Sequence, residues 1–236
     1  MEAITIDDVR AVAPALAKYT EDAIVNGLWK RSALSARDRS IITVSALVAG
    51  ERTIGFAHYF NTALATGVTP AELSEIVTQV AFYAGWSTAF SAVAVLKDIF
   101  AQRGIAADQL PPVAPELLTP QQALPGDDAR VSILQETFGA IVPGLVEITN
   151  DLLYGEVWLR PNLSVHDRNL ATVTALIATG QTEFLGMYLA KAAAVGVTKA
   201  EISELITHLA FYIGWPAALS AAVVAKGVFE GHGLPK

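Results

Sequence analysis

Two arginines that each follow an aspartate are candidates for binding a carboxylate. They occur as Asp38-Arg39 and as Asp167-Arg168. An arginine side chain presents a rigid planar fork of N–H donors that matches the two oxygens of a carboxylate. Arg39 and Arg168 are therefore predicted to hold a small carboxylate substrate. Pairing with the neighbouring aspartates or with another subunit is the alternative role that the sequence leaves open.

One histidine is a candidate base, and another is a candidate for a polar contact in a cleft. An imidazole can take up and release a proton near neutral pH, which makes His58 the best single base in its part of the chain. His208 precedes Tyr212 by four residues, and Gln79 precedes Tyr83 by the same spacing, so each pair shares one face of a helix. These side chains either contact a ligand or lie in the core with their hydrogen bonds satisfied.

The residue types exclude several classes of chemistry. The chain has no cysteine, which rules out disulfides, thiolate metal sites, cysteine nucleophiles and dithiol redox reactions. The four histidines show no metal-ligand spacing, so we expect no metal. They are His58, His166, His208 and His232.

Aromatic residues cluster beside two glycines. Trp86 follows Gly85, and Trp215 follows Gly214. A glycine lets a ring or a ligand approach the backbone closely, which favours a pocket wall that includes Tyr83 and Tyr212. Packing in the core is the alternative interpretation of the same clusters.

The chain is a tandem duplication with an offset of 129 residues. The offset runs without a gap from Pro14 and Pro143 to Lys97 and Lys226. Five prolines fall between the copies, where they disfavour helix and indicate an extended connector. We therefore expect a first repeat over residues 1–104, a connector over 105–128 and a second repeat over 129–236.

Each copy has helical periodicity and helix-start signals. The spacings Ser35-x-x-Asp38 and Ser164-x-x-Asp167 are typical of capping boxes, and a helix is predicted over about 36–50. A second apolar segment over 54–65 ends near Gly67, and the next helix begins at Thr69-Pro70 or at Thr198. Strand-like alternation is weak, so the prediction is an all-α fold with the two copies packed as a pseudo-dimer.

The combined motifs resemble the carboxymuconolactone decarboxylase family, which shares a helical fold with the alkylhydroperoxidase D-like proteins. The resemblance covers both copies and is clearest in the second. It is carried by Gly155 to Pro161, by Asp167-Arg168, by Gly196-Val197-Thr198 and by Tyr212 to Ala218.

The chain departs from the family pattern at the catalytic positions. The peroxidase branch carries a Cys-x-x-Cys pair that is absent here, so thiol peroxidase activity is excluded. The decarboxylase branch usually has a histidine eight residues before the glycine of Gly-Val-Thr, and this chain has Tyr59 and Tyr188 there. A family glutamate matches Glu183 in the second copy but Ile54 in the first. A phenol with a reference pKa of about 10 suits donation to an enolate rather than the role of a base.

The resemblance implies a cofactor-independent decarboxylase-like lyase, or a related isomerase or hydrolase. Its substrate would be a small lactone or keto acid that reacts through an enolate, held by the arginines and by Trp86, Trp215, His208, Tyr83 and Tyr212. We expect no cofactor, since decarboxylation requires none if a lactone carbonyl of the substrate is the electron sink. A ligand-binding or assembly protein without catalysis is one alternative, and a chain in which a single copy is catalytic is another. Because single-repeat relatives form rings of six, a homotrimer of pseudo-dimers is expected.

Charge and hydropathy exclude two kinds of partner. The net charge is −7 and no run of lysine and arginine is present, so nucleic acid is not expected to bind. Residues 76–96 and 205–225 lack charges and are long enough to span a bilayer, but polar residues and a central Gly-Trp pair argue against a membrane span. With no signal peptide visible near residue 1, we expect a cytoplasmic protein.

Overall fold

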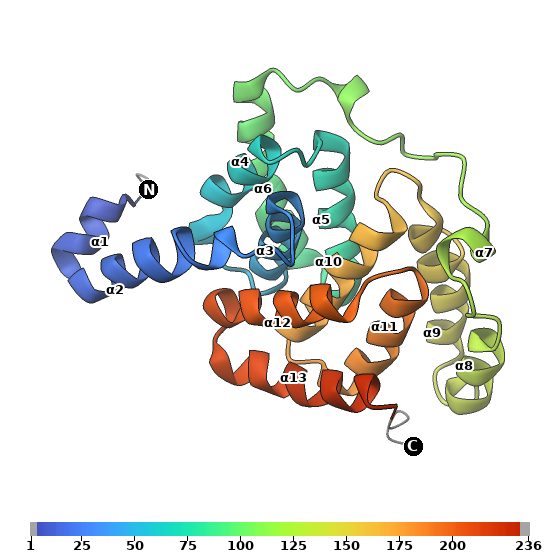
Figure 1. The fold of residues 1–236 in the computed structure, drawn as a ribbon. Helices are drawn as coiled ribbons and strands as arrows, with labels where there is room; N and C mark the ends of the chain where they lie inside the picture. The colour runs from blue at the N-terminus through green and yellow to red at the C-terminus, as the bar shows by residue number, and fades with distance from the viewer. Residues whose placement is uncertain (1–3, 232–236) are drawn as a thin grey trace.

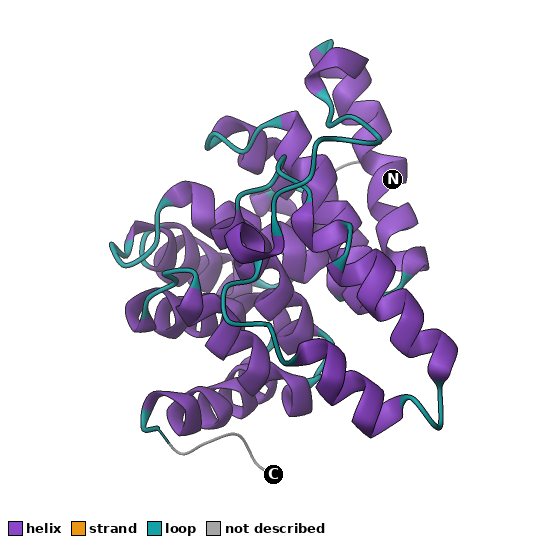
Figure 2. Ribbon diagram, turned by 90° about the vertical axis from the view of Figure 1, so that its right-hand side faces the viewer, coloured by secondary structure: helices purple, strands orange, loops and turns teal. Residues whose placement is uncertain are grey.

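The computed structural model describes residues 4–231, which contain helices and loops and no strand (Figures 1 and 2). The prediction of an all-α fold is therefore confirmed. The four main helices of the first repeat are α3 (Ala36–Ala49), α4 (Phe56–Ala65), α5 (Pro70–Ala84) and α6 (Trp86–Arg103). Their counterparts in the second repeat are α10 (Val165–Ala178), α11 (Thr182–Ala194), α12 (Lys199–Ile213) and α13 (Trp215–Phe229).

In each repeat, two short helices and a π-helical turn precede the four main helices. In the first repeat, α1 (Ile6–Val12) and α2 (Pro14–Tyr19) lead into the π-helical turn Thr20–Val25, and they stand out from the body of the molecule (Figure 1). In the second, α8 (Arg130–Phe138) and α9 (Pro143–Ile148) lead into the turn Thr149–Tyr154. A 3₁₀ turn follows each, at Leu28–Lys30 and Val157–Leu159.

The two repeats meet along α3 and α10, which pack against each other at the centre of the molecule (Figure 1). Every residue of α3 from Arg39 to Ala49 is buried, as is every residue of α10 from Asp167 to Ile177. The neighbouring helices exchange partners, because α5 packs on α10 and α12 packs on α3. This crossed packing makes the chain a covalent pseudo-dimer, as predicted.

The helix that begins each half of the seam is capped differently in the two repeats. Ser35 and Asp38 form the complete capping box that the spacing predicts. Ser164 accepts from the backbone of Asp167, but the carboxylate of Asp167 accepts from Arg37 at 2.8 Å instead of closing the box. The prediction of a second capping box is therefore only half correct. Asp167 instead forms an ion pair with Arg37 of the other repeat.

Glycines divide the long apolar stretches. Gly85 and Gly214 both have φ of 98°, a backbone conformation that side chains with a Cβ rarely adopt. Gly85 ends α5 and Gly214 ends α12, and a new helix starts at the next residue in each case. Within residues 4–231, no helix has the length and the apolar character needed to cross a bilayer.

The connector runs in a mostly irregular conformation along the outside of the molecule, from the end of α6 to α8 (Figure 1). It contains a 3₁₀ turn at Ala107–Gln109 and the short helix α7 (Pro120–Ala123). The backbone N–H of Leu118 donates to the carbonyl of Leu159 at 2.8 Å, which fixes the connector beside the start of the second repeat.

Candidate functional site

The seam contains two equivalent clusters, and each takes side chains from both repeats. Site A combines the first repeat's Trp29, Arg31, Arg39, Thr43 and Tyr59 with the second repeat's Glu204, His208 and Tyr212. Site B combines the second repeat's Trp158, Arg160, Arg168, Thr172 and Tyr188 with the first repeat's Glu75, Gln79 and Tyr83. This exchange follows from the crossed packing of α5 and α12.

An ion-pair network forms the base of site A. Glu204 accepts from Nε of Arg31 at 2.7 Å and from Nη2 of Arg39 at 2.9 Å. Burial alone would raise the pKa of Glu204, but hydrogen bonds from the two arginines outweigh it and hold that pKa below its usual value. The prediction that Arg39 binds a substrate carboxylate is not supported by its position. Arg39 is 0% exposed and already binds a carboxylate of the protein.

His208 lies behind that network as a neutral side chain. The hydroxyl of Thr43 donates to the carbonyl of Arg39 at 2.7 Å, so Nε2 of His208 must donate to that hydroxyl oxygen, 2.8 Å away. Nδ1 then accepts from Nη1 of Arg39 at 3.3 Å. Burial, with the charge of Arg39, lowers the pKa of His208 to about 3. His208 is thus a hydrogen-bonded core residue.

Site B repeats the network with a glutamine in place of the histidine. Glu75 accepts from Arg160 at 2.9 Å and from Arg168 at 3.1 Å. Gln79 accepts from Arg168 at 2.8 Å and donates to Thr172 at 3.0 Å. Arg168 is 1% exposed and is committed to the protein in the same way as its counterpart.

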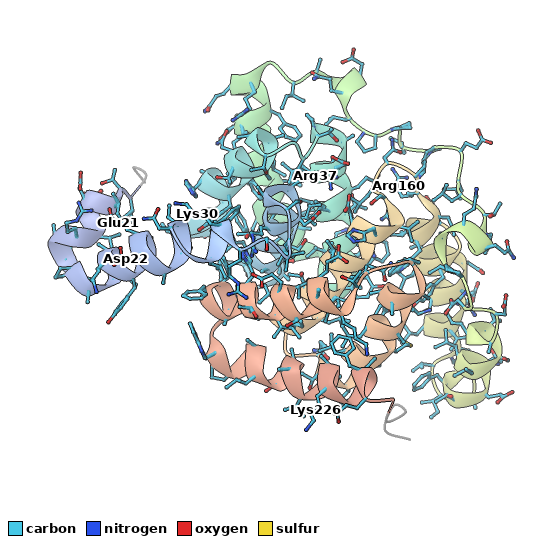
Figure 3. The ribbon with its side chains drawn as sticks, in the orientation of Figure 1. Glu21, Asp22, Lys30, Arg37, Arg160 and Lys226 are labelled. Atoms are coloured by element: carbon cyan, nitrogen blue, oxygen red, sulfur yellow. The ribbon has the colours of Figure 1, made fainter. Side chains whose placement is uncertain are left out.

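The connector completes site B. Arg160 (Figure 3) also donates to the carbonyl oxygens of Pro112 and Val113, at 2.9 Å each. In site A the equivalent Arg31 has a side chain that is 55% exposed, against 10% for Arg160. The base of site B is therefore more deeply buried than the base of site A.

Three aromatic side chains form a hydrogen-bonded cradle in site A. The indole N–H of Trp29 donates to the hydroxyl of Tyr212 at 2.8 Å, and that hydroxyl donates to the hydroxyl of Tyr59 at 3.1 Å. Since Tyr59 accepts this bond, its own proton is left for a group outside the cradle. Burial raises the pKa of Tyr59 despite the bond from Tyr212, so the phenol is protonated at neutral pH.

A cavity of about 840 Å³ opens beside this cradle. Its wall is mostly apolar and includes Trp29, His58 and Tyr59 from the body of the first repeat. The other lining residues lie on or beside α1, α2, the π-helical turn of the first repeat and α4. One of them, Glu21, is labelled in Figure 3. They are Ile4, Thr5, Ile6, Val9, Leu16, Thr20, Glu21, Ile24, Val25 and Thr62.

The cradle of site B faces a side chain instead of a comparable opening. Trp158 donates to Tyr83 at 2.8 Å, and the hydroxyls of Tyr83 and Tyr188 are 3.1 Å apart. The hydroxyl of Tyr154 lies 2.9 Å from that of Tyr188, and the Tyr154 side chain is buried. The guanidinium of Arg130 lies 4.1 Å from the centre of the Tyr154 ring.

Other residues predicted for the site lie elsewhere. Trp86 and Trp215, which were predicted for a pocket wall, are 53% and 54% exposed on α6 and α13 and belong to neither cluster. Glu183 is exposed in the first turn of α11, about 140° around the helix from Tyr188, so the two do not share a face. His232 lies outside the described residues.

Several members of the clusters were missed by sequence reasoning. Glu75 and Glu204 are 129 residues apart, and each precedes the Gln79 or His208 position by four residues, so the duplication contained the signal for them. Tyr154 was missed because its counterpart is Val25, and such a difference between copies attracts no attention in a search for identities. Across residues 4–231, no group of three or more histidines and carboxylates is placed to hold a metal ion.

Comparison with known proteins identifies the repeated unit. A model described as the carboxymuconolactone decarboxylase family matches residues 14–98 and again residues 143–227. The 4-carboxymuconolactone decarboxylase of Acinetobacter baylyi is 43% identical over 81 residues, which are 34% of this chain and 60% of that protein. The nitrosuccinic acid decarboxylase of Metarhizium robertsii is 34% identical over 80 residues, which are 34% of this chain and 56% of that protein.

The matched regions thus span less than two thirds of each relative. Both relatives are named as decarboxylases, which supports a decarboxylase-like role for the family. The two tandem matches confirm the resemblance deduced from the motifs. The chain belongs to the carboxymuconolactone decarboxylase family and contains its unit twice.

Proposed function

We propose that the protein is a cofactor-independent decarboxylase that acts on a small lactone or keto acid in the cavity of site A. The observation that carries the proposal is the position of Tyr59. Its hydroxyl accepts from Tyr212, keeps its own proton, and lies at the wall of an apolar cavity that also contains His58. A donor fixed in this way can stabilise negative charge that develops on a substrate oxygen.

The proposed reaction uses the substrate's own carbonyl as the electron sink. The bond between the carboxylate and the carbon that carries it breaks, and carbon dioxide leaves. The electron pair moves into the carbonyl to give an enolate, directly in a β-keto acid and through the ring C=C bond in 4-carboxymuconolactone. The enolate oxygen accepts from the hydroxyl of Tyr59, while Trp29 and Tyr212 hold that hydroxyl in place. The α-carbon then takes up one proton to give the product.

His58 is the proposed source of that proton. It lies on α4 next to Tyr59, and among the lining residues that the structure describes it is the one with a basic side chain. A protonated imidazole can pair with the substrate carboxylate before the bond breaks and can donate to the carbon afterwards. The buried arginines take no direct part, because Glu204 and Glu75 occupy them.

The test is carbon dioxide release and the change in ultraviolet absorbance with 4-carboxymuconolactone. Replacing Tyr59 by Phe should lower kcat about 10- to 100-fold, since it removes one charge-stabilising donor. Tyr188→Phe is the matched control and should leave kcat unchanged. Equal losses in the two variants, or full activity of Tyr59→Phe, would contradict the assigned role.

A non-catalytic ligand-binding protein is the second candidate. It is favoured by the tyrosines that stand at the family histidine position in both repeats. It predicts that a ligand of the site A cavity raises Tm without being converted to a product. Turnover by the wild-type protein decides against it.

We also propose that three chains assemble into a ring. The outer faces of α6 and α13 expose equivalent apolar side chains, Trp86 and Phe90 in one repeat and Trp215 and Leu219 in the other. Exposed apolar patches of this kind favour a contact between copies. Light scattering should give about three times the mass of one chain, whereas the mass of a single chain would exclude the ring.

A further inference from the structure

Tyr154 fills in site B the place that is open in site A. Tyr154 and Val25 are each the last residue of the π-helical turn of their repeat, and they are 129 residues apart. The ring of Tyr154 lies nearly parallel to Trp158, at an interplanar angle of 11° and a centroid distance of 6.1 Å. It is 5% exposed, whereas Val25 is 53% exposed and lines the cavity.

The aromatic cradle that faces the cavity in site A and the one that faces Tyr154 in site B have nearly the same internal distances. Trp29 and Tyr59 stack at 6.4 Å, and their counterparts Trp158 and Tyr188 stack at 6.2 Å. The bond from the indole N–H is 2.8 Å in both sites, and the next hydroxyl-to-hydroxyl distance is 3.1 Å in both. A molecule that enters site A therefore meets the surface that Tyr154 meets in site B.

We infer that Tyr154 imitates, within the chain, the ligand of site A. Site A is accordingly specific for a planar, phenol-like ring that lies along Trp29 and presents a hydroxyl, enol or carbonyl oxygen to Tyr59. Site B is closed by Tyr154, so each chain binds one ligand. This inference rests on the proposed function in taking the cavity of site A as the place of the reaction.

The side chains around Tyr154 explain why site B stays closed. The ring is flanked by Arg130, and Nζ of Lys191 lies 5.3 Å from its centre while also pairing with Asp127. The residue equivalent to Lys191 in the first repeat is Thr62, which is uncharged and lines the cavity. The first repeat therefore provides neither the ring nor the lysine that hold site B shut.

The volume of the cavity leaves room for a ligand larger than a bare phenol. A cavity of about 840 Å³ lies toward the upper end of the range of small-molecule pockets, so it holds a ring together with substituents. Substituents on the ring would extend toward His58 and toward the residues of α1. Among the lining residues that the structure describes, His58 is the one basic partner for a carboxylate on such a ring.

The test is isothermal titration calorimetry of the full chain with p-cresol, which is the side chain of tyrosine without its backbone. The wild-type protein should bind one p-cresol per chain. Val25→Tyr should weaken binding at least tenfold, because the new ring takes the place beside Trp29 that Tyr154 takes beside Trp158 in site B. The π-helical turn of the second repeat already carries a tyrosine at this position, so the variant is expected to fold.

Two further variants test the closed site and the hydrogen bond. Tyr154→Val should raise the stoichiometry to two per chain, and Tyr154→Phe, which keeps the ring, should leave it at one. Tyr59→Phe should weaken p-cresol about tenfold, the effect of losing about one hydrogen bond, and should leave the binding of toluene unchanged. If Tyr154→Val does not fold, Val25→Tyr and Tyr59→Phe decide the question.

The inference is overturned if wild-type protein binds no p-cresol or two per chain, or if Val25→Tyr binds it as well as wild type does. These outcomes are independent of turnover. Decarboxylation of a lactone without p-cresol binding would refute only the phenol-like specificity. One p-cresol per chain at site A without any turnover would refute only the proposed function.

Discussion

Arg39 and Glu204 belong to different repeats, yet their side chains meet at 2.9 Å with the arginine wholly excluded from solvent. The equivalent contact between Arg168 and Glu75 measures 3.1 Å. A buried arginine must be paired, because the charge cannot be solvated in any other way. These two contacts therefore couple the folding of one repeat to the presence of the other.

Replacing Glu75 by Ala should lower the free energy of unfolding by about 3–5 kcal/mol, because it leaves two buried arginines without a counter-charge. Glu204→Ala should lower the free energy of unfolding by less. One of its partners, Arg31, has a side chain that is 55% exposed and can be hydrated by solvent. Urea unfolding monitored by circular dichroism measures both. An unchanged free energy of unfolding in Glu75→Ala, or a larger decrease in Glu204→Ala than in Glu75→Ala, would contradict the roles assigned to the two networks.

His208 should make the protein sensitive to mild acid. Its pKa is lowered to about 3 in the folded chain by burial and by Arg39, whereas an unfolded histidine has the ordinary value of 6.5. The unfolded state therefore binds a proton first, and stability that is fully present above pH 6.5 is lost as the pH falls toward 3. At pH 5 the loss is about 2 kcal/mol, at about 1.4 kcal/mol per pH unit.

The matched variant for this prediction is His208→Gln, which installs the residue that the first repeat has at Gln79. Between pH 7 and pH 5, the free energy of unfolding of this variant should fall by about 2 kcal/mol less than that of the wild-type protein. Carboxylates elsewhere titrate alike in both proteins and cancel from the comparison. Urea unfolding at the two pH values measures the difference, and equal pH dependence in the two proteins would show that His208 is not the group responsible.

A difference between the repeats also predicts a stabilising substitution. Glu51 has φ of 50°, and its counterpart Gly180 has φ of 74°. A left-handed conformation is strained for glutamate and free of strain for glycine. Glu51→Gly should therefore raise the free energy of unfolding by about 0.5–1 kcal/mol, while Gly180→Ala should lower it by about 1 kcal/mol. Thermal unfolding checks both, and a lower Tm for Glu51→Gly would show that its hydrogen bond from Ser91 outweighs the strain.

The helices were predictable because their signals are local. Thr69-Pro70 and Thr198 begin α5 and α12 as expected, and Gly85 ends a helix with the positive φ that its position requires. The composition of the two sites was not predictable in the same way. Periodicity shows which face of a helix is buried, but not that α5 of the first repeat lies against α10 of the second. Arg168 was therefore interpreted without its partner Glu75.

Trp29 should act as a positioning residue for Tyr59. Its indole N–H donates to the hydroxyl of Tyr212, which directs the proton of that hydroxyl toward Tyr59 and leaves the proton of Tyr59 for the cavity. Trp29→Phe keeps a ring beside Tyr59 but removes this donor, so Tyr212 can also accept from Tyr59. We expect kcat to fall about three- to tenfold, the equivalent of one hydrogen bond of about 1 kcal/mol, with a smaller change in KM.

Trp158→Phe is the control, because it removes the same donor from site B, where Tyr154 occupies the cradle. It should change Tm without changing kcat. Steady-state kinetics with 4-carboxymuconolactone, beside thermal unfolding of both variants, separates the two effects. A loss of kcat in Trp158→Phe equal to that in Trp29→Phe would mean that both sites react, and that Tyr154 must move aside during turnover.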